Sequence, residues 1–179
     1  AVKDAAARYG GHIVAIPRDS LPILADADGN ALWNADSDWE AVTQFVKSDG
    51  AKHAILAMGA PAYLGGEAAA QLAADGTPTD VYVVNGLPLP DDFLAGIFEK
   101  YSGGVVTIED GIIATRASGL RGFASLVSSA AAGTGTPTEH VGIIDPRVAP
   151  SEGHAEVWEH FGLTTGELVT AVQSLKRNG

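Results

Sequence analysis

The chain has 179 residues, of which 46% are hydrophobic, and this length is enough for a globular protein with one sizeable buried core. Its formal net charge of -11 argues against direct binding to a nucleic-acid backbone or to an anionic membrane. The absence of cysteine excludes disulfides and cysteine nucleophiles, and it favours a cytoplasmic location. The longest apolar runs have only the length of a strand, against the roughly 20 residues of a bilayer helix, so we expect no membrane span.

The chain opens with a helical pattern over Val2 to Tyr9 and a strand pattern over Ile13 to Ile16. It starts without Met and without the basic-then-apolar order of a signal peptide, which indicates a trimmed or separately expressed segment. The strand leads into Arg18. An arginine at the carboxyl end of a strand is well placed to bind an anion, because its guanidinium offers a rigid fork of donors. The alternative is an ordinary surface arginine.

The next segment is a linker followed by an expected helix. Turn-forming residues at 26–30 and the lack of a sustained period place the linker at residues 25–37. Asp36, Ser37 or Asp38 is a suitable helix cap. The apolar residues that follow have helical spacing and predict one buried face, made by Trp39, Val42, Phe45 and Val46.

From residue 53 onward, short apolar runs alternate with helical stretches, as in the βα units of a largely parallel sheet. This pattern predicts a three-layer α/β/α fold with a mostly parallel, mixed sheet of about five strands. The expected strands are 53–58, 80–84, 104–108 and 140–144. The expected helices are 62–75, 90–101, 118–132 and two that close the chain, the first capped by Ser151 and the second by Thr164 with Glu167, with Leu168, Val172 and Leu175 on its apolar face.

Glu109 and Asp110 stand at the carboxyl end of a predicted strand, where acid and base groups of enzymes are often found. Adjacent residues on a strand point to opposite faces, so the two carboxylates converge only if the turn redirects one of them. We therefore expect a turn or interface role for this pair.

Two other patterns have some features of a ligand site. Glu156 and His160 stand one helical turn apart, a spacing that can share a metal, but His154 lies on a different face and no third ligand is evident. The turn at 58–61 precedes a helix but lacks the Lys and the Ser or Thr of a P-loop. We assign no catalytic, cofactor-binding or metal-binding residue from these patterns.

Five segments carry a family resemblance, and they are Pro17 to Pro22, Ala54 to Gly59, Val105 to Gly111, Gly119 to Val127 and Ala149 to Thr164. In this order and spacing they resemble the C-terminal part of transketolase-like thiamine diphosphate enzymes. The resemblance covers essentially the whole chain. The first segment looks like the transketolase run of serine, arginine, glutamine, asparagine, leucine and proline that ends the pyrimidine-binding domain.

By this resemblance, Arg18 is the candidate contact for the phosphate of a sugar substrate. Pro17 and Asp19 replace the serine and glutamine of the family, so a carboxylate neighbours Arg18 and is expected to weaken anion binding or change the substrate. The Gly-Asp-Gly diphosphate signature of the family and its cofactor-activating glutamate are absent. The resemblance thus implies that thiamine diphosphate and Mg²⁺ belong to the complete enzyme, and that this chain alone neither binds them nor is catalytic.

The resemblance also implies a domain division. Residues 1–24 correspond to the tail end of a pyrimidine-binding domain, 25–37 to the linker, and 38–179 to a transketolase C-terminal-like domain. On this division, residues 1–24 pack poorly on the remainder or contact a partner. The implied partners are the remaining thiamine-binding domains or subunit, a second copy in a homodimer, and a phosphorylated sugar.

The implied function is the subunit-contact and substrate-entrance part of a cytoplasmic pentose phosphate enzyme that transfers two-carbon ketol units between sugar phosphates. Two alternatives remain open. One is the equivalent domain of a 2-oxoacid dehydrogenase E1 component or a deoxyxylulose-phosphate synthase. The other is a non-catalytic module that binds a small anion or serves in assembly.

Overall fold

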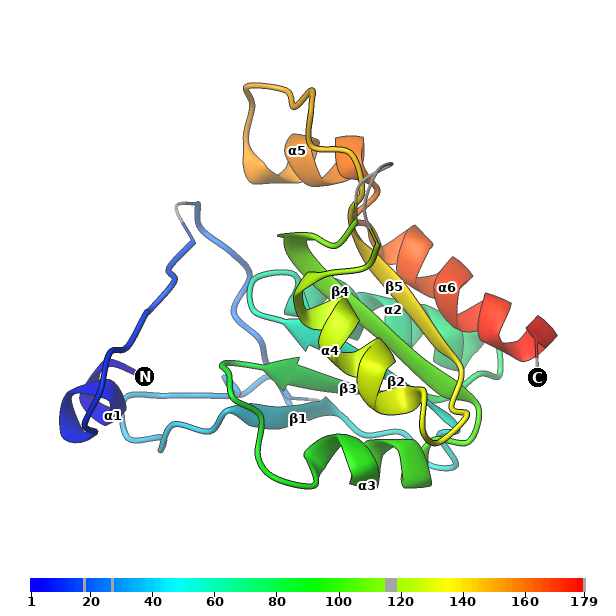
Figure 1. Ribbon diagram of the computed structural model, residues 1–179, viewed down its shortest axis with the longest axis horizontal. Helices are drawn as coiled ribbons and strands as arrows, with labels where there is room; N and C mark the ends of the chain where they lie inside the picture. Colours follow the sequence, from blue (N-terminus) through cyan, green and yellow to red (C-terminus); the bar gives the residue numbers. More distant parts are fainter. Residues whose placement is uncertain (18, 27, 115–118, 179) are drawn as a thin grey trace.

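The centre of the molecule is a five-stranded sheet with the order β1-β3-β2-β4-β5 (Figure 1). The computed structural model describes residues 1–17, 19–26, 28–114 and 119–178. Four strands run parallel, and the fifth, β1, pairs antiparallel with β3 at one edge. The strands are β1 (Val42–Val46), β2 (His53–Met58), β3 (Thr79–Val84), β4 (Gly104–Ile112) and β5 (Thr138–Ile143).

Helices cover both faces of this sheet. One face carries α2 and α6, which also pack on each other, and the opposite face carries α3 and α4. The fold is therefore α/β with three layers, as the sequence pattern predicts. These helices are α2 (Ala62–Ala74), α3 (Phe93–Lys100), α4 (Gly122–Ala131) and α6 (Thr165–Asn178), with α1 (Val2–Ala7) and α5 (His154–Phe161) away from the sheet faces (Figure 1).

The central strand β2 explains why two helical layers are needed. Its residues from His53 to Ala57 are all buried, whichever face of the sheet they point to. A parallel strand that is covered on both faces has an almost continuous apolar sequence rather than an alternating one. For this reason the apolar run at 53–58 predicts a buried strand from the sequence alone.

Close packing of α2 on the sheet depends on two glycines. A Cβ added at Gly65 would lie 3.0 Å from a methyl carbon of Val81, and one at Gly66 would lie 2.6 Å from the ring of Phe45. The helix therefore approaches β1 and β3 at a distance that larger side chains would prevent.

The structure forms a strand where helical spacing predicts a helix. Residues Val42–Val46 form β1, in which Val42 pairs with Val84 and Thr43 with Val83. The expected helix is wrong because the spacing of apolar residues along the chain contains no information about a distant strand. Here that strand is β3, whose edge is available for pairing with β1. That edge supplies ladder hydrogen bonds, and β-branched residues fit the pleated surface of a strand.

Smaller differences concern helix ends. α3 begins at Phe93 rather than at residue 90, and α5 begins at His154 with Gly153 as its N-cap rather than Ser151. The expected start of α4 at residue 118 lies outside the described residues. At the second closing helix, the backbone N–H of Glu167 donates to Thr164 Oγ1 over 3.2 Å, as the capping pattern predicts.

The N-terminal arm, residues 1–17, extends away from the α/β body (Figure 1). The strand expected at Ile13 to Ile16 is not formed, and the side chains of Ile13 and Ile16 are 99% and 79% exposed. A strand needs a neighbouring strand for its backbone hydrogen bonds, and residues 13–16 have none in the described part of the chain. This expectation is wrong for the chain on its own.

The segment after the arm returns to the body of the molecule. Leu21, Leu24, Leu32 and Trp33 are partly buried against the core beside α2 and α6. A bridge between Ala25 and Ala31 closes a turn within this segment. The domain division at residues 24 and 37 stays a prediction. Within the described residues, every helix is too short or too polar to cross a lipid bilayer.

The core on the α6 side should be sensitive to loss of volume. Leu168 is completely buried, so Leu168→Ala is expected to lower the free energy of unfolding by about 2–5 kcal/mol. The measurement is urea unfolding followed by circular dichroism. Leu126→Ala is the matched control on α4, because Leu126 is 43% exposed and its truncation should cost less than about 1 kcal/mol. Equal losses for the two variants would contradict this placement of the core.

Candidate functional site

The carboxyl ends of the parallel strands define the edge of the sheet where ligands of open α/β folds bind. Beyond the ends of β4 and β5 lies α5, which is set apart from the main helical layers (Figure 1). The N-terminal segment reaches the same region through Asp19, which contacts the first residue of α5. This edge is the candidate functional site.

Glu109 has a structural position at this edge. Its carboxylate is buried, and its Oε1 accepts a hydrogen bond of 2.8 Å from the backbone N–H of Ala124 in the first turn of α4. Gly122 has a φ of +67°, and a Cβ there would lie 2.7 Å from Glu109 Oε2. The carboxylate therefore caps α4 from a neighbouring strand, where the positive end of the helix dipole stabilises negative charge.

Asp110 points elsewhere and is exposed. The pairing of β4 with β5 is irregular between Ile108 and Ile112, the stretch that contains the acidic pair. The Glu109 carboxylate is buried against α4 and the Asp110 residue is exposed, so the two side chains have different surroundings. The turn or interface role expected for Glu109 and Asp110 stays a prediction.

The most informative contact at the edge joins Asp19 to His154. Asp19 Oδ2 accepts a hydrogen bond of 3.0 Å from the backbone N–H of His154 and lies 3.2 Å from His154 Nδ1. The two side chains are 32% and 29% exposed, so the contact is partly shielded from water. It connects segments that lie 135 residues apart in the sequence.

Aromatic packing fixes His154 against the core. Its imidazole lies edge-on to Trp158 at a centroid distance of 5.2 Å, and Trp158 stacks on Tyr63 of α2 at 6.0 Å. Trp158 is buried within the core cluster beside α2 and α6. The amino end of α5 is thereby attached to the body of the domain.

Arg18, the candidate anion contact, lies outside the described residues. Its neighbour Asp19 is the residue that replaces the glutamine of the transketolase run, and the structure gives its carboxylate a partner on α5. Sequence reasoning identified Asp19 as unusual but did not connect it with His154. No sequence periodicity links two residues so far apart.

A shallow cavity of about 490 Å³ opens between the end of β5 and α5. Arg147 Nη2 lies 2.5 Å from Asp145 Oδ2, so its charge is paired with a carboxylate. His160 Nε2 lies 3.0 Å from the backbone carbonyl oxygen of Val148. The lining residues are Ile144, Asp145, Arg147, Val148, His160 and Phe161.

The residues that were considered as metal ligands do not gather. Among the described residues, no three His, Cys, Asp or Glu side chains lie close enough together to hold a metal ion. Glu156 and His160 share one helix, but His160 is hydrogen-bonded to the loop before α5.

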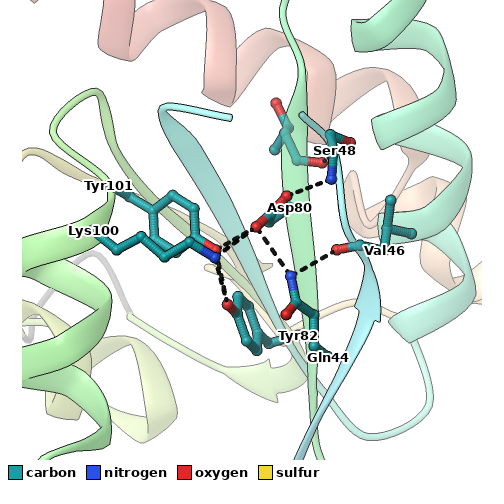
Figure 2. A network of polar contacts seen from close by, with 8 residues as sticks. Gln44, Val46, Ser48, Asp80, Tyr82, Lys100 and Tyr101 are labelled. Atoms are coloured by element: carbon teal, nitrogen blue, oxygen red, sulfur yellow. Dashed lines mark hydrogen bonds and ion pairs between the residues drawn. The ribbon is translucent and has the colours of Figure 1, made fainter. Parts of the chain in front are cut away.

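A second polar cluster lies at the opposite end of the sheet, near the amino end of β3 (Figure 2). Asp80 is 2% exposed, and its Oδ2 accepts hydrogen bonds from Tyr101 at 2.5 Å and from Lys100 at 3.0 Å. Gln44 donates to the same oxygen, and the backbone N–H of Ser48 donates to Oδ1. The cluster joins α3 to the segment around β1 and lies away from the candidate functional site.

The hydrogen bonds determine the ionisation of this cluster. Burial alone would raise the pKa of Asp80, but the hydrogen bonds from Tyr101, Ser48 and Lys100 outweigh burial and hold the pKa below its usual value. Burial and the bond to Asp80 raise the pKa of the Tyr101 hydroxyl. Asp80 is therefore a carboxylate and Tyr101 a neutral donor at neutral pH.

Solved transketolases have a similar fold. A split-gene transketolase, described as an inactive beta4 tetramer, matches with a TM-score of 0.69 and 24% identity over 89% of this chain and 48% of that one. Transketolase from Campylobacter jejuni matches with a TM-score of 0.53 and 21% identity, over 75% and 18% of the two chains. Transketolase from Leishmania mexicana matches with a TM-score of 0.53 and 18% identity, over 77% of this chain and 18% of that one. No protein-family model and no curated protein matches the sequence.

These likenesses, together with the mixed five-stranded sheet, define the chain as a transketolase C-terminal-like α/β domain in fold. The chain spans about half of the split-gene transketolase chain, 48% of its length, and 18% of the other two. The activity and substrates of a complete enzyme are therefore matters for a proposal.

The stability contributed by Asp80 should depend on pH. A carboxylate whose pKa is lowered on folding stabilises the protein above the pKa of the unfolded state, and this contribution is lost as the pH falls through the folded value. Asp80→Asn should therefore lower the free energy of unfolding at pH 7, and the difference from wild type should shrink as the pH falls below about 4. Urea unfolding of both proteins across this range measures the effect. A difference that is constant with pH would contradict it.

Proposed function

We propose that this chain is the C-terminal, subunit-contact and substrate-entrance part of a transketolase-type transferase, which moves two-carbon ketol units between sugar phosphates. The observation that carries the proposal is the match in fold to a split-gene transketolase over 89% of this chain. The run from Pro17 to Pro22 supports it, because Asp19 within this run contacts α5 beyond the carboxyl ends of the strands.

In this proposal Arg18 contacts the phosphate of the sugar. Its guanidinium can bind phosphate through two parallel hydrogen bonds, which a lysine cannot reproduce. The carboxylate of the adjacent Asp19 accepts hydrogen bonds from His154, so part of its charge is balanced by the amino end of α5. This contact supports a phosphate role for Arg18 despite its acidic neighbour.

The chemistry of the complete enzyme depends on thiamine diphosphate and Mg²⁺, which supply the group that carries the ketol unit. We propose that their binding site lies in the remaining thiamine-binding domains or subunit, because the Gly-Asp-Gly diphosphate signature of the family is absent from this sequence. This chain contributes to substrate binding and to assembly. A cytoplasmic location and a dimeric or larger homo-oligomer are parts of the same proposal.

The exposed arm supports a partner for the N-terminal segment. Ile13, Val14 and Ile16 expose 99%, 45% and 79% of their surfaces, an unusual state for three neighbouring β-branched residues. We propose that residues 1–24 are the tail end of a pyrimidine-binding domain, where residues 13–16 pair with another strand. The solved split-gene transketolase is itself described as a tetramer.

The role of Arg18 is tested by Arg18→Ala in the complete enzyme. We expect the KM for phosphorylated sugars to rise about tenfold or more, since a charge-assisted contact to phosphate is lost. The measurement is steady-state kinetics with a phosphorylated ketose. Arg147→Ala is the matched control, because Arg147 is an exposed arginine near the same edge that pairs with Asp145.

An unchanged KM in the Arg18→Ala enzyme would refute the transketolase assignment. It would favour a 2-oxoacid dehydrogenase E1 component, whose substrate carries no sugar phosphate. A rise of equal size in the Arg147→Ala control would assign the effect to general loss of positive charge.

The location of the cofactor site is tested with the isolated chain. Titration calorimetry with thiamine diphosphate and Mg²⁺ is expected to show no saturable binding, whereas the complete enzyme should bind both. Saturable binding to the isolated chain would place the cofactor site here and overturn this part of the proposal.

A further inference from the structure

Asn85 joins the end of β3 to the β1 entry, which is the name used here for residues 39–41. Its side-chain amide nitrogen donates to the backbone carbonyl oxygen of Glu40 over 3.1 Å. Its backbone N–H and that of Gly86 both donate to the carbonyl oxygen of Ala41, over 2.7 and 3.3 Å. These three hydrogen bonds attach the start of the edge strand to its neighbour in the sheet.

The residue that follows Asn85 makes this asparagine chemically reactive. In deamidation the backbone nitrogen of the next residue attacks the asparagine Cγ, a C–N bond forms, and the side-chain nitrogen leaves as ammonia. Water then opens the cyclic imide to aspartate or isoaspartate. Glycine has no side chain to hinder the attack, and its backbone has the greatest freedom to approach Cγ. Asn85 is exposed and is followed by Gly86.

The β1 entry restrains the reaction in the folded chain. Trp39 packs closely on Gly86, since a Cβ at the glycine would lie 2.8 Å from Trp39 Cζ2. The bond to Ala41 holds the nitrogen that would attack, and the bond to Glu40 holds the side chain that it would attack. Attack on Cγ therefore requires the β1 entry to open locally, which costs less free energy than global unfolding.

Deamidation would reverse the hydrogen bonding at this position. The amide nitrogen that donates to Glu40 is replaced by a carboxylate oxygen, which can only accept, so two acceptors would face each other. Asn34 gives a contrast, because it uses its side-chain oxygen instead. Its Oδ1 accepts the backbone N–H of Asp36 over 2.8 Å, and an aspartate at position 34 would keep this acceptor.

We propose that Asn85 is a deamidation site guarded by the β1 entry, and that its conversion to a carboxylate detaches the start of β1 from β3. The reaction consumes only water and releases ammonia. Reclosing of the strand does not restore the amide, so a transient opening of the β1 entry becomes permanent. This inference is independent of the proposed function.

The first test follows deamidation of the chain at mildly alkaline pH by peptide mapping and mass spectrometry. Asn85 should be converted about tenfold or more faster in urea than in the folded chain, because urea removes the guard. In the folded chain Trp39→Ala should speed conversion about threefold or more, because Gly86 loses its cover. Phe93→Ala, which truncates a partly buried aromatic residue on α3, is the matched control and should leave the rate within about twofold of wild type.

Three results of this test would overturn the inference. Failure of Asn85 to react in urea would exclude the modification site. Equal rates in urea and in the folded chain would exclude the guard. Equal acceleration by Trp39→Ala and Phe93→Ala would assign the protection to global stability rather than to the β1 entry.

The second test examines the product directly. Asn85→Asp introduces the carboxylate, and Asn34→Asp introduces the same charge where the hydrogen bond uses oxygen. Amide hydrogen exchange in Val42–Val46, measured by NMR, should be about tenfold or more faster in Asn85→Asp than in wild type, and unchanged in Asn34→Asp. Unchanged exchange in Asn85→Asp would contradict the detachment of β1. The same acceleration in both variants would assign the effect to the added charge alone.

Discussion

Burial of the central parallel strand is the constraint on which the structure depends. β2 hydrogen-bonds to β3 on one side and β4 on the other, and nearly all of its residues are inaccessible to solvent. A strand of this kind requires a helical layer on each face, and helices then serve as the crossovers between parallel strands. The same arrangement directs the carboxyl ends of the strands to one edge. The candidate site lies at this edge, where ligands of open α/β sheets bind.

The alternating strands and helices from residue 53 onward could be predicted from the sequence. The edge strand β1 and the conformation of residues 13–16 could not. Buried strands such as β2 have apolar runs that a single sequence displays, and α6 shows its buried stripe of Leu168, Val172 and Leu175. β1 was mistaken for a helix because its identity as a strand depends on the open edge of β3. The expected strand at 13–16 failed for the converse reason, since its sequence favours a strand but this chain offers it no neighbour.

The candidate site could be predicted only in part. Glu109 was recognised as an acid at a strand end, and its assignment to a structural role agrees with the cap that it provides for α4. The phosphate role of Arg18 follows from its chemistry and from the family resemblance, and it stays a prediction. The contact between Asp19 and His154 was missed because it requires the folded sheet to bring the two segments together. Sequence reasoning therefore located the edge but not the contacts that organise it.

The contact between Asp19 and the amino end of α5 has a consequence for the order of folding. Helix caps are usually supplied by the adjacent residue and can form as soon as the first turn does, whereas this cap closes a loop of 135 residues. The entropy of closing so long a loop is offset only when the intervening strands have already assembled. We therefore expect the amino end of α5 to be completed late, after the sheet, with the N-terminal segment attached to the domain in the same step.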